Sequence, residues 1–230
     1  MWIYVFRRTL LLIPIFFIIS VVVFSLIHLV PGNPIDSLLG PGSTELDRVE
    51  LTKAYGLDKS LPVQYFVWMK KFITGDMGQS IIEKQPVVDM IFYNMPFTVR
   101  LGLASLLISF VLGIFLGIIS AAAKNTYIDH ISMILALLGV TVPAFWLGLI
   151  LMLIFSVMLG WFPVSGSGSL KTLVLPAITV GLGGAGLIAR ITRVSMLEMF
   201  NKEFVLLLYA KGLSKPVIII KHIFRNALMP

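Results

Sequence analysis

The sequence of 230 residues contains no cysteine and few charged residues. Without thiols, these residues can form no disulfide, no thiolate metal site and no thiol nucleophile. The three histidines, His28, His130 and His222, lie far apart and lack metal-ligand spacing, so neither a metal site nor another cofactor is predicted. Only 13% of the residues are charged, whereas soluble domains average about 25%. Together with the 58% hydrophobic content, this scarcity excludes a soluble globule and predicts an all-α integral membrane protein.

Four long apolar segments predict four transmembrane helices, since about 20 residues cross a bilayer. They comprise residues 9–30, about 97–123 (opened by Pro96), about 131–159 and about 172–189. No Asp, Glu, Lys or Arg lies inside them except Arg100, which sits at an edge. Ion-coupled carriers keep ionisable groups near mid-membrane. Their absence disfavours an ion-coupled carrier and favours a passage that is powered from outside the membrane.

The sequence also lacks a nucleotide-binding motif in the required context. Residues 181–186 read G-x-G-x-x-G, but they lie inside an apolar span and follow no predicted strand. These glycines more simply permit close helix packing or a bend. Lys171-Thr172 resembles the end of a P-loop, but Leu170 stands where glycine is needed. An ATP-driven function would therefore require a separate ATPase.

Two patterns within the spans leave alternatives open. Gly113 and Gly117 form a G-x-x-x-G motif, which either mediates a helix contact or is incidental. Pro143, in the third span, frees a backbone carbonyl and kinks the helix. With Phe145 and Trp146, this kink either shapes a substrate path or makes ordinary contacts with lipid and helices.

The basic residues indicate how the chain is oriented in the membrane. If Arg7 and Arg8 place the N-terminus in the cytoplasm, alternation puts Lys124 and everything after Ala189 on the same side. Those segments hold ten Lys and Arg residues but only three acidic residues, which accounts for the whole net charge of +7. The basic character therefore marks the cytoplasmic side of a membrane protein, and no nucleic-acid partner is predicted.

The predicted topology divides the chain into three parts. Residues 1–30 form a cytoplasmic tip and the first span, 31–95 an external helical cap, and 96–230 a membrane domain whose segment 190–230 is cytoplasmic.

Helix signals support the external cap. A turn at residues 31–34 ends the first span. Residues 44–47 read as a capping box for a short helix that Gly56 ends. Pro62 suits the first turn of a second helix that runs to Thr74. Its apolar face lies at the outer membrane surface or packs on the spans, and consists of Tyr65, Trp68, Met69 and Phe72.

After the fourth span, the sequence becomes basic and helical. Residues 196–210 predict a helix that Gly212 ends, and Ser214 can cap a second helix with Pro216 in its first turn. Both helices have apolar faces. They form either a compact knob on which a soluble, energy-supplying partner docks or a surface that rests on lipid headgroups, and the residues alone leave both interpretations open.

Short motifs along essentially the whole chain carry a family resemblance. They are Arg7-Arg8-x4-Ile13-Pro14, Pro31-Gly32-Asn33-Pro34, Tyr55-Gly56-Leu57-Asp58, Leu61-Pro62-Val63-Gln64-Tyr65, Gly75-Asp76-Met77-Gly78-Gln79-Ser80, Pro96-x-Thr98, Asp129, Pro143-x-Phe145-Trp146, Gly160-Trp161-Phe162-Pro163, Leu175-Pro176-Ala177, Arg190-x-x-Arg193 and Ala210-Lys211-Gly212-Leu213-Ser214. In this order and spacing, the chain resembles the first permease subunit of bacterial peptide-type ABC importers, the dipeptide, oligopeptide and nickel family.

The resemblance implies a type I ABC importer permease fold in the bacterial cell membrane. It implies no catalytic residue and no cofactor, because two cytoplasmic ATPase subunits supply the energy. The other implied partners are a second permease subunit, an external solute-binding protein and membrane lipid. The implied solute is a short peptide or a related small solute, nickel among them.

In this family, the segment around a glycine is called the coupling helix, and it fits a groove on the ATPase. It corresponds here to Leu207, Leu208, Tyr209, Ala210, Lys211, Gly212, Leu213 and Ser214. The first three of these replace a more polar, alanine-rich run. Because family members continue with two further spans, we expect a fragment, a truncated product or a split subunit. An inactive remnant or a non-transport membrane scaffold is the alternative.

Overall fold

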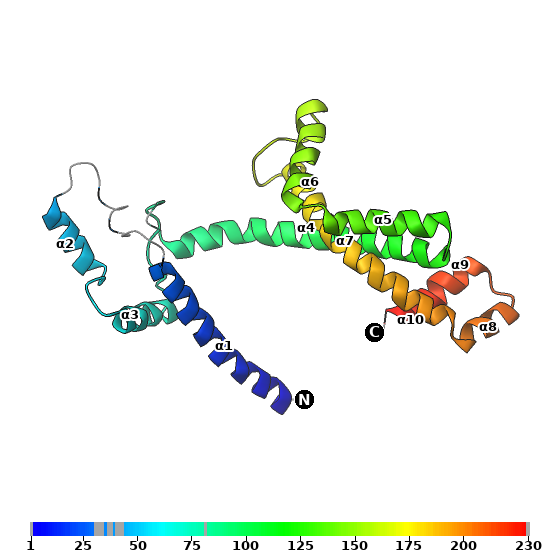
Figure 1. Cartoon of the computed structure of the whole chain (residues 1–230), viewed down its shortest axis with the longest axis horizontal. Coiled ribbons are helices and arrows are strands. Elements are labelled where there is room, and N and C mark those ends of the chain that lie inside the picture. The colour runs from blue at the N-terminus through cyan, green and yellow to red at the C-terminus, as the bar shows by residue number, and fades with distance from the viewer. Residues whose placement is uncertain (1, 30–34, 36–38, 40–43, 81, 229–230) are drawn as a thin grey trace. The chain divides into compact units, whose positions relative to one another are not determined.

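The computed structural model describes residues 2–29, 35, 39, 44–80 and 82–228, so the turn predicted at 31–34 lies outside the described residues. Within these ranges the chain is helical and no strand is found, which confirms the predicted all-α class (Figure 1). Three described helices are long and apolar enough to cross a membrane, or four if one bent pair forms a single span. The chain divides into two units, Met1–Tyr93 and Asn94–Pro230, which are described separately.

In the first unit, α3 (Leu61–Ile73) packs on α1 (Trp2–Leu29) through aromatic side chains. The Tyr65 hydroxyl lies 2.8 Å from Ser20 Oγ, and the Tyr65 ring meets Phe24 edge to face at a centroid distance of 5.4 Å. Trp68 stands 6.1 Å from the same phenylalanine ring. Of the two alternatives for the apolar face of this helix, packing on the first span is therefore confirmed.

The helix before it, α2 (Glu45–Ala54), begins at the predicted capping box. The Thr44 backbone N–H donates to Asp47 Oδ2 at 2.7 Å, and the Asp47 N–H donates back to Thr44 Oγ1 at 3.4 Å. The first of these bonds lowers the pKa of the Asp47 carboxyl below its usual value. Gly56 adopts a φ of +67°, as expected at a helix C-terminus, so both predicted ends of this helix are confirmed.

The helix of the second span, α4 (Val87–Ala122), begins well before Pro96, so the predicted start at this proline is wrong. A proline inside a helix removes only one hydrogen bond, here the one that the carbonyl of Phe92 would accept. The apolar residues on both sides continue the helix across that gap.

The predicted kink at Pro143 is a complete break. α5 (Tyr127–Thr141) and α6 (Ala144–Leu151) meet at 104°, and α6 continues as the π-helical segment η2 (Met152–Met158). Val142 is extended, with φ −75° and ψ 125°. Because a proline disfavours the helical conformation of the residue before it, Val142 ends α5.

The fourth apolar segment and the next predicted helix share one continuous helix, α7 (Leu170–Phe200). The predicted helix over 196–210 is wrong at its start, because 196–200 belong to α7 and α8 (Glu203–Ala210) begins after a break at Asn201. Residues 187–200 contain neither glycine nor proline, so nothing ends the helix where the sequence turns basic.

Glycines bring α7 close to α4 on one side and to α5 on another (Figure 1). A Cβ added to Gly117 of α4 would lie 2.6 Å from Thr192 Cβ, and one added to Gly113 would lie 2.7 Å from Ile188 Cβ. A Cβ on Gly186 of α7 would meet the backbone of α5. The G-x-x-x-G contact is thus real, and the G-x-G-x-x-G stretch serves helix packing.

We expect Gly117→Ala to destabilise the protein by about 1–3 kcal/mol, because the new methyl group overpacks the contact between α4 and α7. Gly102→Ala is the matched control in the same helix, since a Cβ there would meet nothing within 4 Å. Unfolding titrations in detergent measure both variants. Equal stability of Gly117→Ala and the unsubstituted protein would show that the helices can separate at no cost.

Candidate functional site

After α7 and α8, the chain folds into three short segments, α9 (Lys215–Val217), the π-helical η3 (Ile218–Phe224) and α10 (Arg225–Ala227). Their buried side chains join the ends of α4 and α7 in one apolar cluster, which contains Ala121, Met196, Val205, Ile218, Ile219, Ile223 and Ala227. This cluster fastens the segment to the helices before it. We call residues 196–228 the C-terminal knob, and both interpretations of its role, partner docking and lipid contact, stay predictions.

The loop at the tip of the knob is fixed by its hydrogen bonds. The Gly212 N–H donates to the Tyr209 carbonyl at 2.9 Å, and the Leu213 N–H reaches back to the Leu208 carbonyl at 3.3 Å. Gly212 takes a φ of +78°, which glycine adopts without strain. Ser214 stands at the N-cap of α9, as predicted, but its side chain makes no capping bond.

The eight residues from 207 to 214 are brought together by this turn, and they face two ways. Leu208 and Leu213 pack against the apolar cluster, whereas Leu207, Tyr209 and Lys211 are exposed. The leucines of this run therefore have two roles, because one anchors the loop and its neighbour presents apolar surface.

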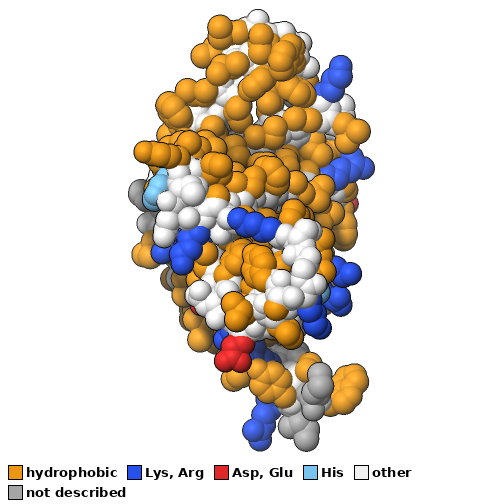
Figure 2. All heavy atoms as spheres, turned by 90° about the vertical axis from the view of Figure 1, so that its right-hand side faces the viewer, with side chains coloured by type: hydrophobic (Ala, Val, Ile, Leu, Met, Phe, Trp, Pro, Cys, Tyr) orange, Lys and Arg blue, Asp and Glu red, His pale blue; other side chains and the backbone are white. Residues whose placement is uncertain are grey.

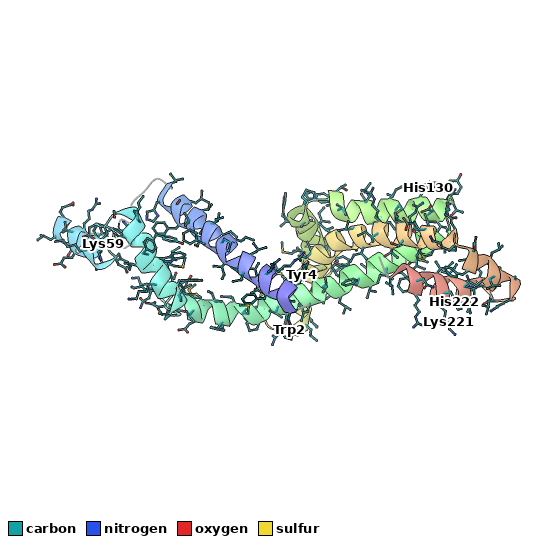
Figure 3. The ribbon with its side chains drawn as sticks, turned by 90° about the horizontal axis from the view of Figure 1, so that it is seen from below. Trp2, Tyr4, Lys59, His130, Lys221 and His222 are labelled. Atoms are coloured by element: carbon teal, nitrogen blue, oxygen red, sulfur yellow. The ribbon has the colours of Figure 1, made fainter. Side chains whose placement is uncertain are left out.

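Basic side chains surround this end of the second unit. Figure 2 looks onto it and shows Lys and Arg side chains (blue) around orange apolar groups. Figure 3 shows Lys221 and His222 on η3 at the same end, with His130 at the start of α5 lying apart from them. No group of three His, Cys, Asp or Glu residues within the described ranges has the arrangement of a metal site.

Beside the knob, four residues form a polar group around the buried Asp129 carboxylate, which we call the Asp129 clasp. Arg193 Nε and Nη2 donate to Asp129 Oδ1 and Oδ2, each at 2.8 Å. The Ser120 hydroxyl also donates to Oδ1, and the Asn125 backbone N–H donates to Oδ2 at 3.0 Å. The clasp therefore joins the end of α4, the following connector, the first turn of α5, and α7.

The clasp satisfies a carboxylate that is only 1% exposed. Asn125 turns its N–H toward the carboxylate by adopting a φ of +63°, a conformation that asparagine tolerates better than most residues. No buried side-chain N or O atom within the described ranges lacks a hydrogen-bond partner. A buried charge must be paired and hydrogen-bonded, and the Asp129 carboxylate, whose partner Arg193 is 25% exposed, meets that condition.

The sequence did not predict this pair. Asp129 and Arg193 are 64 positions apart and fall in separate motifs, so no local spacing links them. One signal was present, because Asp129 is the single acidic residue in a short connector on the side of the membrane predicted to be basic. Once buried, such a residue needs a cation, but the sequence shows neither the burial nor which cation pairs with it.

A groove of about 440 Å³ lies between α6 and α7, next to the broken span. Phe145, one of the three residues predicted for a substrate path, lines it and is 73% exposed. Lys171 and Thr179 contribute from α7, whereas Pro143 and Trp146 do not line it. The structure thus brings one of the three predicted path residues into a groove.

Glycine-packed helices that are long and apolar enough to cross a membrane mark the chain as a helical membrane protein. Residues 113–230 match the family described as "Binding-protein-dependent transport system inner membrane component", and residues 1–102 match its N-terminal counterpart, "Binding-prot-dependent transport system membrane comp, N-term". The chain belongs to this family, whose members are transporter components rather than enzymes. The resemblance to peptide-type ABC importer permeases is confirmed.

Two named relatives are similar over nearly all of this chain. The dipeptide transport system permease protein DppB of Alkalihalophilus pseudofirmus is 36% identical over 255 residues, covering 99% of this chain and 77% of the relative. The glutathione transport system permease protein GsiC of Escherichia coli K12 is 36% identical over 228 residues, covering 99% of this chain and 74% of the relative.

Proposed function

We propose that this permease forms part of the import pathway for short peptides. The names of its relatives, for dipeptide and glutathione transport, support this substrate class. Neither name mentions nickel, which is the weaker alternative. The fragment, truncated-product and split-subunit interpretations stay predictions, as does the alternative of an inactive remnant or scaffold.

The proposed energy source is a pair of cytoplasmic ATPases, one of which docks on residues 207–214 of this chain. The observation that carries this proposal is that the loop has an inner and an outer side. Leu208 packs against the apolar cluster, while Leu207, Tyr209 and Lys211 are exposed. Exposed aromatic and apolar side chains on a rigid turn are typical of docking surfaces. ATP-driven closure of the ATPases would then push on the knob.

The remaining partners are proposed from the family resemblance, and the orientation is proposed from the distribution of basic residues. A second permease subunit pairs with this chain, and an external binding protein delivers the peptide in the bacterial cell membrane. The N-terminus and the segment 190–230 face the cytoplasm because basic residues collect there. The segment 31–95 forms the external cap, and 96–230 forms the permease domain.

The substrate path is proposed to pass the break at Pro143, beside Phe145 and Trp146. Broken helices expose unpaired backbone groups, and transporters place substrates at such breaks. Pro143 has no N–H, so the carbonyl of Gly139 lacks its usual helical donor. Lys171 supplies a positive charge at the groove, which suits the carboxylate end of a peptide.

The test is uptake of a radiolabelled dipeptide by liposomes that contain the assembled complex, its binding protein and internal ATP. We expect uptake to require ATP and the binding protein. Uptake that persists without ATP but stops when the proton gradient is collapsed would instead support an ion-coupled carrier. No uptake by the complete assembly would support the scaffold.

Gly212 allows a sharper test of the coupling role. We expect Gly212→Val to lower the affinity for the ATPase by about tenfold, because a β-branched residue is strained at a φ of +78°. Gly212→Asn is the matched control, since asparagine tolerates this conformation and a Cβ there would meet nothing within 4 Å. Binding measured with immobilised ATPase compares them. Equal, undiminished binding by both variants would contradict the docking role.

A further inference from the structure

We infer that the Asp129 clasp is a positioning device for transport, which makes the knob and the start of α5 move as one body. The inference rests on the proposed function, because it assigns the step between ATPase docking and the substrate path. Asp129 and Arg193 touch no substrate in this scheme. They act by holding helices in register while the knob is pushed.

The geometry of the clasp restricts relative motion of its parts. Each carboxylate oxygen of Asp129 accepts a hydrogen bond from a different Arg193 nitrogen, so the carboxylate and guanidinium planes are fixed relative to each other. The Ser120 hydroxyl and the Asn125 N–H hold the same oxygens from the α4 side. A single apolar contact between helices could slide, whereas four directed bonds to a buried carboxylate cannot slide without leaving a charge unpaired.

The clasp is continuous with the knob through the chain itself. Ser120 precedes Ala121, and Arg193 lies three residues before Met196 on α7. Ala121 and Met196 both belong to the apolar cluster that fastens the knob. A displacement of the knob is therefore delivered directly to the two helix ends that the clasp joins.

From the clasp, α5 leads to the broken span. Asp129 lies in the first turn of α5, and the same helix ends at Val142, where the chain turns by 104° into α6. A break of this kind absorbs rotation as a hinge while the helices on both sides stay rigid. Movement of the α5 start would thus change the opening at Phe145, which follows the hinge and lines the groove.

The competing explanation is that the clasp is only a staple that stabilises the fold. Buried ion pairs are weak evidence for stability, because an apolar pair of similar volume often stabilises as well. If the clasp is a staple, an apolar replacement should transport normally once it folds. If it transmits motion through fixed geometry, the apolar replacement should fold and still lose coupling.

The experiment replaces both partners, as Asp129→Leu with Arg193→Met, in the complete complex in liposomes. Ser120 can then donate to the carbonyl four residues before it, and the exposed Asn125 N–H can bond water, so no buried polar group is stranded. We expect the ATPase to co-purify unchanged while dipeptide uptake per ATP hydrolysed falls by about tenfold. Arg190→Met is the matched control, because it removes a positive charge from an exposed position on the same helix.

A conservative variant guards against misfolding. Arg193→Lys keeps both charges but loses the two-pronged geometry, so we expect an intermediate loss of uptake per ATP. Unchanged uptake per ATP in the folded double variant, or in Arg193→Lys, would overturn the inference alone. Failure of the unsubstituted protein to bind ATPase would overturn the proposed function, and the inference with it.

Discussion

Arg193→Met alone should lower the free energy of unfolding by about 3–5 kcal/mol, because it leaves the Asp129 carboxylate buried without its cation. This is the largest stability effect that we expect in the chain. Asp129 is 1% exposed, so water cannot replace the two bonds from Arg193 without opening the contact between α5 and α7. Unfolding titrations in detergent, followed by circular dichroism, measure the loss.

Two further variants separate the unpaired charge from other causes. Asp129→Leu combined with Arg193→Met should recover most of the stability, because the desolvated charge is gone. Arg190→Met, at an exposed position one turn earlier, should change stability by less than about 0.5 kcal/mol. A double variant as unstable as Arg193→Met would show that side-chain volume, and not the unpaired charge, sets the cost.

Local rules predicted the parts of the fold that depend on a few neighbouring residues. The capping box at Thr44 and Asp47 and the positive φ at Gly56 and Gly212 are set by short-range chemistry, and all appear in the structure. The apolar segments likewise predicted helices of membrane length, because bilayer thickness sets that length.

Helix ends inside apolar stretches depend on longer-range packing, and there the predictions failed. Pro96 is accommodated within α4, although proline often begins a helix, since the flanking apolar turns continue. α7 runs past Ala189 to Phe200, because a change to basic composition marks the membrane edge and not a helix end. Composition reports the surroundings of a segment and does not by itself end a helix.

Only the parts of the candidate site that neighbouring residues determine were predicted from the sequence. The turn around Gly212 follows from its own residues, so the sequence located it. The pairing of Asp129 with Arg193 joins segments 64 positions apart. Nothing in a single sequence indicates that Asp129 pairs with Arg193 and not with Arg190. The inward direction of Leu208 likewise depends on a cluster that residues of α4, α7, α8, η3 and α10 build together.

Tyr209→Ala should weaken ATPase binding by about 30-fold, the effect of removing about 2 kcal/mol of aromatic contact at an interface. Tyr209 is 46% exposed beside the Gly212 turn, so its removal leaves the apolar cluster of the knob intact and stability nearly unchanged. Tyr127→Ala is the matched control, because this tyrosine is 88% exposed in the first turn of α5, on the same proposed side of the membrane. Titration of purified ATPase onto the complex in nanodiscs compares the two. If the ATPase docks on residues 207–214, only Tyr209→Ala binds it weakly. Equal losses in both variants would mean that the contact also includes the connector before α5. Undiminished binding by Tyr209→Ala would mean that the loop is not part of the interface.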